Sequence, residues 1–169
     1  MKLSIKPVGW MGTRYELALE DSAAGRATGS GEGHGEALGE LNATWGMLRS
    51  KVRLAGRSLR LRRCFLSSLV ALEDRGRVLV EAKKPGLLTR TYTVRSAEGV
   101  FRLETDGVFL VSHRLLHGQR CVGRIRRSGV LRTTWGGTFD DDLSLELCAF
   151  VLMHLAQLEQ EHTTAVAAS

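Results

Sequence analysis

Residues 143–158 constrain the fold of this chain more than any other segment. Twelve of these sixteen residues are apolar, and Leu147 to Met153 form an unbroken apolar run. At 3.6 residues per turn such a run covers the whole circumference of a helix, and a helix that is apolar all round is buried on all sides. The segment therefore predicts a core helix that other elements surround.

A membrane-spanning helix is the alternative interpretation of the same segment. Sixteen residues at about 1.5 Å each span only about 24 Å, less than the ~30 Å hydrocarbon core of a bilayer. Glu146, His154 and Gln157 also interrupt the apolar run. No other stretch of the sequence reaches about 18 uninterrupted apolar residues, so we expect no transmembrane segment.

Polar residues before and within this helix have structural roles in our interpretation. Asp140, Asp141 and Asp142 precede it, where carboxylates can cap free N–H groups and complement the positive end of the helix dipole. A hard cation such as calcium is the alternative partner of these carboxylates, but three consecutive residues rarely converge on one ion, so we expect no metal site. We interpret His154 as a core histidine with a hydrogen-bond partner, because an unpaired buried polar group is costly.

Short segments that alternate apolar and polar residues occupy most of the chain before the helix. Turn signals separate them, and the count is about ten to twelve strands, which is typical of an antiparallel sandwich or barrel. A barrel of ten to twelve strands has room inside for one helix, whereas eight strands are filled by their own side chains. The number of strands therefore predicts a barrel with room for a helix, and the apolar helix predicts a barrel around it. The candidate strands are 13–20, 43–52, 58–62, 65–72, 77–82, 90–95, 100–104, 108–113, 121–126 and 130–135.

The length of 169 residues predicts one domain. We assign residues 1–162 to it, with the central helix at 141–160. Residues 21–39 are rich in glycine, alanine, serine and glutamate and predict a flexible loop. Residues 163–169 predict a disordered tail.

The net charge of +6 favours an anionic partner. The aromatic fraction of only 6% argues against a base-stacking surface, although the charge itself would also suit nucleic acid. Cys64, Cys121 and Cys148 are far apart and odd in number, which indicates reduced thiols. With no signal-peptide pattern at residues 1–10, we expect a cytoplasmic protein.

Two strand segments carry paired arginines. Side chains two residues apart share one face of a strand, so Arg60 points with Arg62, and Arg124 points with Arg126. If the two strands lie close together, the four guanidinium groups form one outward basic patch, and such groups suit phosphate oxygens. The alternative is an ordinary solvated barrel surface. We find no G-x-S-x-G or H-E-x-x-H motif, so we expect no catalytic residues, no cofactor and no enzymatic activity.

Three motifs resemble a known family. They are Arg90, Tyr92 and Val94 in one strand, Val122-Gly123-Arg124-Ile125 in another, and Phe139-x-x-Asp142-Leu143 before the apolar helix. Over roughly residues 65–158 the chain resembles the phospholipid scramblase and LURP-one-related proteins of the tubby C-terminal-like superfamily. The resemblance implies a twelve-stranded antiparallel barrel around a C-terminal hydrophobic helix. It also implies phosphoinositide binding by basic surface residues, as in tubby domains. The acidic calcium segment of scramblases is reduced here to Asp140–Asp142, so we do not expect scramblase activity.

These observations predict a non-enzymatic barrel that binds an anionic ligand, such as a phospholipid or phosphoinositide headgroup, on a basic face. The alternative is a structural or protein-interaction module that docks a protein partner and has no lipid ligand.

Overall fold

A computed structural model describes most of the chain, and its described residues form twelve strands and one helix. The described residues are 1–8, 14–20, 36–42, 49–64, 69–86, 91–106, 111–129 and 133–167. In chain order the strands are β1 (Lys2–Val8), β2 (Arg14–Leu19), β3 (Glu36–Asn42), β4 (Arg49–Leu54), β5 (Arg57–Cys64), β6 (Leu69–Asp74), β7 (Arg77–Lys83), β8 (Thr91–Ser96), β9 (Gly99–Thr105), β10 (Ser112–His117), β11 (Arg120–Ser128) and β12 (Thr134–Phe139). The helix is α1 (Leu145–Ala167).

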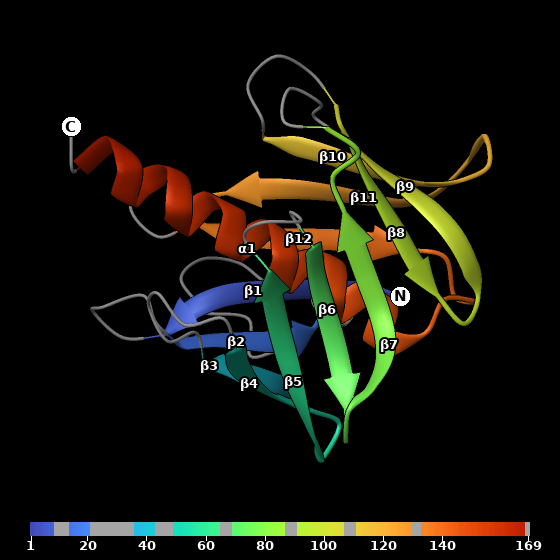
Figure 1. The fold of residues 1–169 in the computed structure, drawn as a ribbon. Helices are drawn as coiled ribbons and strands as arrows, with labels where there is room; N and C mark the ends of the chain where they lie inside the picture. Colours follow the sequence, from blue (N-terminus) through green and yellow to red (C-terminus); the bar gives the residue numbers. More distant parts are fainter. Residues whose placement is uncertain are drawn as a thin grey trace, which may run out of the picture.

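The strands form one closed antiparallel barrel (Figure 1). Each strand pairs with its neighbours in sequence, and β1 closes the ring by pairing with β12, with Leu3 opposite Gly137 and Ile5 opposite Trp135. Closure leaves none of the twelve described strands at the edge of a sheet, where its backbone groups would be unpaired. The predicted antiparallel barrel is confirmed.

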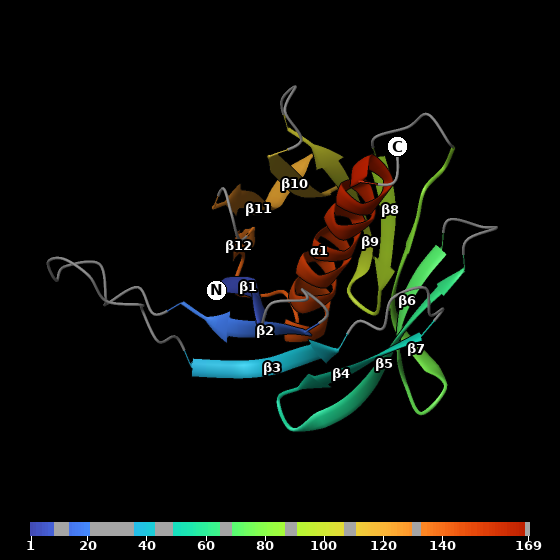
Figure 2. The ribbon, with the colours of Figure 1, turned by 90° about the vertical axis from the view of Figure 1, so that its left-hand side faces the viewer.

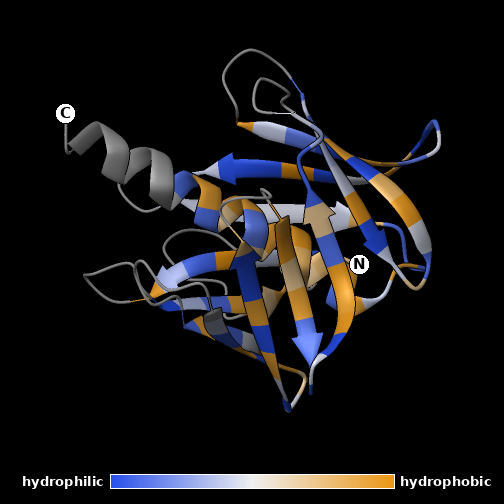
Figure 3. Ribbon diagram, viewed as in Figure 1, coloured by the Kyte–Doolittle hydropathy of each residue, from blue (hydrophilic) through white to orange (hydrophobic). Residues whose placement is uncertain are grey.

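Alternation along the strands places apolar side chains inside the barrel and charged ones outside. In β5, Leu59 and Leu61 expose 1% and 2% of their surface, whereas Arg60 between them is exposed. Hydrophobic and hydrophilic residues also alternate along much of the other strands (Figure 3), with consecutive buried residues in β2, β6, β10 and β11. The period of two along a strand therefore produces an apolar interior and a charged exterior.

The helix α1 passes through the middle of the barrel (Figure 2). Each residue from Leu147 to Ala156 exposes 4% of its surface or less, so no side of this segment faces solvent. A twelve-stranded ring is wide enough to hold a helix, and the helix fills the space that the strands enclose. The prediction of a helix buried on all sides is confirmed. In the described part of the chain, no helix combines the length and apolar content that a bilayer crossing requires.

The helix begins differently from our prediction. Ser144 is the N-cap: its hydroxyl accepts a hydrogen bond from the Leu147 backbone N–H at 3.3 Å, and its carbonyl accepts one from Cys148 at 3.2 Å. Asp140 instead pairs with Arg120 at 2.6 Å, and Asp141 pairs with the terminal amine of Met1. The capping role predicted for the aspartates is therefore wrong, since Ser144 caps the helix and the carboxylates of Asp140 and Asp141 pair with cations instead. Their effect on the helix dipole stays a prediction.

A polar cluster holds the helix where it leaves the barrel. The Glu159 carboxylate accepts a hydrogen bond from Trp135 Nε1 at 2.8 Å and forms an ion pair with Arg127 at 2.6 Å. Burial, followed by the charge of Glu159, raises the pKa of Tyr15 to about 12. These contacts connect α1 to β11 and β12 and fix its position along the barrel axis.

Glycine allows the helix to lie close to β12. A Cβ atom on Gly137 would lie 2.5 Å from Phe139 Cε2 and 3.4 Å from Leu152 Cδ2, so a larger residue does not fit without displacement. We expected the strand pattern to end before Gly136 and Gly137, but β12 continues through both to Phe139. Glycine here marks close packing, and not the end of a strand.

Several predicted boundaries differ from the structure. β1 has no counterpart among the predicted strands, and β3 begins at Glu36, inside the predicted loop 21–39. The strand predicted at 108–113 is β10, displaced to Ser112–His117. The helix continues past its predicted end at residue 160 to Ala167, so the prediction of a disordered tail at 163–169 is wrong for residues 163–167. Residues 21–35, the rest of the predicted loop, lie outside the described residues.

Tight turns at one end of the barrel fix the strand register. Ala55 and Gly56 connect β4 to β5, and Arg75 and Gly76 connect β6 to β7, all with φ between 47° and 88°. Two-residue turns with positive φ at both positions match the right-handed twist of the strands they join. They keep the outward residues of β4 and β5 directly opposite one another.

Candidate functional site

The four predicted arginines lie on opposite sides of the barrel. Arg60 and Arg62 belong to β5, and Arg124 and Arg126 belong to β11. In either direction around the ring, five strands separate β5 from β11. The two pairs therefore do not form the single patch that closely spaced strands would have produced. Within each pair the residues do share the outer face, as the period of two predicts.

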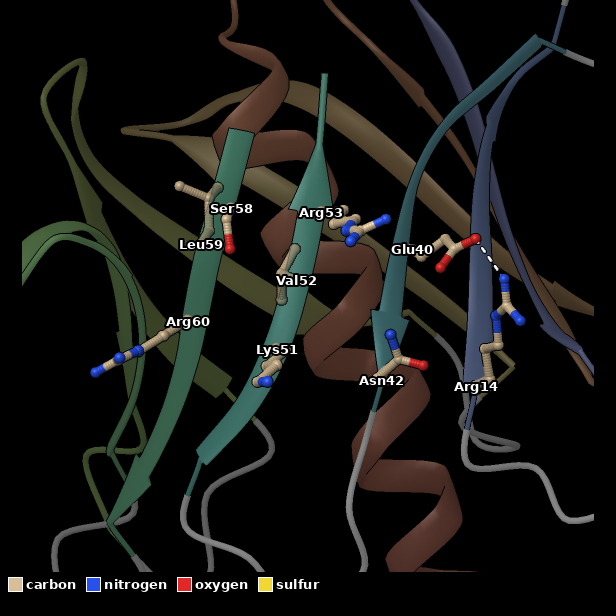
Figure 4. Close-up of a pocket in the computed structure, with 9 residues that line it drawn as sticks. All are labelled: Arg14, Glu40, Asn42, Lys51, Val52, Arg53, Ser58, Leu59 and Arg60. Carbon is tan, nitrogen blue, oxygen red and sulfur yellow. Dashed lines mark hydrogen bonds and ion pairs between the residues drawn. The ribbon is translucent and has the colours of Figure 1, made fainter. Parts of the chain in front are cut away.

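Arg60 lines a basic depression on the outer surface of β2 to β5, which we call the β2–β5 face (Figure 4). The depression has a volume of about 470 Å³, and its cations outnumber its carboxylates four to one. Its charged side chains are Arg14, Glu40, Lys51, Arg53 and Arg60.

The strand register explains why these cations gather. Lys51 on β4 lies directly opposite Arg60 on β5, and Asn42 and Arg14 continue the same row across β3 and β2. Like charges directly opposite one another in a sheet repel and reduce stability. The position of Lys51 opposite Arg60 is therefore unfavourable on a solvated surface alone. An anion bound between the two side chains would reduce their repulsion.

Ion pairing on the β2–β5 face is incomplete. Arg14 is 2.5 Å from the Glu40 carboxylate, and Figure 4 shows this pair at the edge of the depression. Among the described residues, no carboxylate forms an ion pair with Lys51, Arg53 or Arg60. Three positive charges are thus available to an external anion.

Arg62 belongs to a different environment. Its Nε lies 2.6 Å from Glu73 Oε1 on β6, although the two groups are not aligned for a hydrogen bond. The carboxylate neutralises Arg62, and this residue does not line the depression. Of the predicted pair on β5, only Arg60 therefore faces the candidate site.

Sequence reasoning missed three of the four cations on this face, which are Arg14, Lys51 and Arg53. Lys51 and Arg53 alternate with the buried residues Ser50, Val52 and Leu54, so a period-of-two pattern was present in residues 49–54. The strand predicted at 43–52 stopped within that pattern. Residues 43–48 of that prediction lie outside the described residues.

Arg124 and Arg126 lie beside a smaller depression of about 150 Å³ on β10 and β11. Arg114 on β10 is directly opposite Arg124, and Ser112 is opposite Arg126. The Arg114 Nε is 3.8 Å from Asp106 Oδ1, which is a weak contact between two exposed groups.

The interior contains one histidine whose environment differs from our expectation. His154 is 1% exposed, and neither of its ring nitrogens has a hydrogen-bond partner among the described residues. Its ring contacts Tyr92 edge-on with centroids 4.6 Å apart and stacks on Phe150 at 6.0 Å. Burial, followed by the nearby charge of Arg63, lowers the pKa of His154 to about 3. The predicted hydrogen bond is absent, and the histidine is a neutral part of the core.

The remaining candidates for chemistry among the described residues would be a buried thiol and clusters of possible metal ligands. Burial raises the pKa of the Cys148 thiol to about 12, which keeps it protonated and unreactive. Within the described segments, no three histidine, cysteine, aspartate or glutamate side chains gather in a way that could hold a metal ion. Comparison with family models, curated proteins and solved structures gives no match to this chain.

Proposed function

We propose that this protein is a non-enzymatic binding module whose β2–β5 face binds the phosphate-bearing headgroup of an anionic lipid at a membrane surface. The observation that carries the proposal is the group of three cations, Lys51, Arg53 and Arg60, on adjacent strands. No carboxylate in the described part of the chain pairs with them.

The chemistry of the cations fits phosphate. A guanidinium group offers several N–H donors in a planar fork that matches two phosphate oxygens, and an ammonium group adds a compact positive charge. Arg53 lies two residues from Lys51 on the same face of β4, and Arg60 lies opposite Lys51 on β5, so all three side chains can approach one anionic group. Binding would also remove the repulsion between Lys51 and Arg60.

The fold suits a surface-binding role. The apolar helix is enclosed by the barrel (Figure 2), so it is not available for insertion into a bilayer. A lipid would therefore contact the charged residues on the outside of the barrel. The resemblance to the tubby C-terminal-like superfamily supports the same ligand class, because tubby domains bind phosphoinositides through basic surface residues.

Co-sedimentation with lipid vesicles tests the proposal. Wild-type protein is compared on phosphatidylcholine vesicles with and without phosphatidylserine, at low and high salt. We expect binding only to the anionic vesicles, with weakening as salt screens the attraction. A basic residue near an anionic surface contributes about 1 kcal/mol, so the triple variant Lys51→Ala, Arg53→Ala, Arg60→Ala should lose on the order of 100-fold of the affinity of this face and bind more weakly than the wild type.

Arg95→Ala is the matched control for these substitutions. Arg95 is an exposed cation on β8, away from the β2–β5 face, and it lies 3.6 Å from Glu81. This variant should bind like the wild type. Equal binding to neutral and anionic vesicles, or wild-type affinity of the triple variant, would overturn the proposal. The absence of any vesicle binding would overturn it too and would favour a protein partner without a lipid ligand.

A further inference from the structure

We infer that the barrel has a second anion-binding face, opposite the first, and that the protein therefore bridges two anionic membranes. The second face consists of Arg114, Arg124 and Arg126 on the outside of β10 and β11, and we call it the β10–β11 face. The inference rests on the proposed function, because it assigns the same ligand class to both faces.

The β10–β11 face shares two features with the β2–β5 face, which are like charges opposite one another on adjacent strands and exposed cations without an ion pair. Arg114 and Arg124 are like charges directly opposite one another across adjacent strands. Arg124 and Arg126 are exposed, and neither has an ion pair among the described residues. A depression lies beside them, so a phosphate group could approach between the guanidinium groups.

Carboxylates separate the two faces on one side of the barrel. On the strands between them, Glu73 pairs with Arg62, Glu81 with Arg95, and Glu104 with Arg102, with distances of 2.6, 3.6 and 2.5 Å. The positive charge of these strands is therefore locally neutralised. The unpaired cations lie on either side of this neutral zone.

Acidic residues also interrupt the other side. On β1 and β2, Lys6 lies directly opposite Glu16. The surface therefore does not carry one continuous basic belt. It carries two basic faces, separated in both directions by charges of opposite sign.

The geometry of the barrel prevents both faces from touching one flat membrane. The cations Lys51, Arg53 and Arg60 lie on β4 and β5, which are opposite β10 and β11 in the ring, and the buried helix fills the space between these two walls. The two faces therefore point in opposite directions on a rigid body. A molecule bound through one face presents the other to a second membrane.

Vesicle clustering tests this inference separately from binding. Wild-type protein is added to phosphatidylcholine vesicles that contain phosphatidylserine, and the mean particle diameter is followed by dynamic light scattering while co-sedimentation measures binding. We expect the diameter to rise with protein and to fall again at excess protein, when each vesicle is coated separately. Vesicles of phosphatidylcholine alone should not cluster.

Substitutions on the β10–β11 face distinguish vesicle binding from vesicle clustering. Arg124→Ala with Arg126→Ala should still co-sediment with anionic vesicles through the β2–β5 face but should lose clustering, while Arg95→Ala should cluster vesicles like the wild type. Wild-type protein that binds vesicles without clustering them would overturn bridging and leave the proposed function intact. Full clustering by the double variant would also overturn it, because bridging would then not depend on this face. Failure of the wild type to bind would overturn both proposals.

Discussion

Replacement of His154 by leucine isolates the energetic effect of the one fully buried imidazole in the described core. The side chain is 1% exposed and lies between Tyr92 and Phe150, and neither ring nitrogen has a hydrogen-bond partner among the described residues. A neutral polar group that is buried without a partner costs about 1–3 kcal/mol. Leucine has no polar atoms, so we expect His154→Leu to be at least as stable as the wild type at neutral pH.

The pH dependence of stability gives a sharper expectation. The pKa of His154 falls from 6.5 to about 3 on folding, because burial disfavours the charged form and Arg63 repels it. The unfolded state therefore binds a proton more readily than the folded state does, and the folded protein loses stability as the pH falls below about 6.5. At about 1.4 kcal/mol per pH unit, the loss between pH 7 and pH 5 is about 2 kcal/mol.

Urea unfolding followed by circular dichroism at pH 7 and pH 5 measures this loss. The free energy of unfolding of the wild type should decrease by about 2 kcal/mol more than that of His154→Leu. Met153→Leu is the control, since it changes a neighbouring buried side chain and removes no titratable group. It should retain the wild-type pH response. Equal pH dependence in the wild type and His154→Leu would refute the assignment of a neutral, unpaired histidine to the core.

Two further predictions concern the packing of the helix against the barrel. Gly137→Ala should destabilise the protein by about 1–3 kcal/mol in urea unfolding, because the new Cβ would lie 2.5 Å from Phe139 Cε2. Gly136→Ala, whose Cβ would meet nothing closer than 4.0 Å, should have a much smaller effect, and equal effects would contradict the packing argument. Phe150→Asp should abolish folding, since it buries an unpaired charge at a position that is 0% exposed. Phe150→Leu should remain folded at a cost below about 3 kcal/mol, and a native-like circular dichroism spectrum of Phe150→Asp would show that this helix face is not buried.

Much of the fold was predictable because its signals are local. The period of two in residues 58–62 placed Leu59 and Leu61 inside and Arg60 outside without reference to any other strand. The apolar circumference of residues 147–153 required a surrounding shell, and the number of strands supplied one of sufficient size. The predicted ends of the strands were less accurate. Gly136 and Gly137 were interpreted as the end of a strand, whereas close packing requires glycine within β12.

The candidate site was only partly predictable. That Arg60 faces outward follows from its buried neighbours in sequence, and the same argument applied to β4 would have found Lys51 and Arg53. The charges around each arginine did not follow from sequence, because Glu73 neutralises Arg62 from an adjacent strand while Glu40 is occupied by Arg14. Pairing across strands depends on register, which is set by turns and closure.

The sequence by itself determined which residues face inward and that a helix must lie within a shell. These properties arise from the spacing of apolar residues over short stretches, where backbone geometry alone assigns each side chain to a face. Only the tertiary structure decided that β5 and β11 lie on opposite walls, so that Arg60 belongs to one basic face and Arg124 and Arg126 belong to another. It also left His154 without a hydrogen-bond partner, because the chemistry of a buried group depends on residues that closure brings from distant parts of the chain.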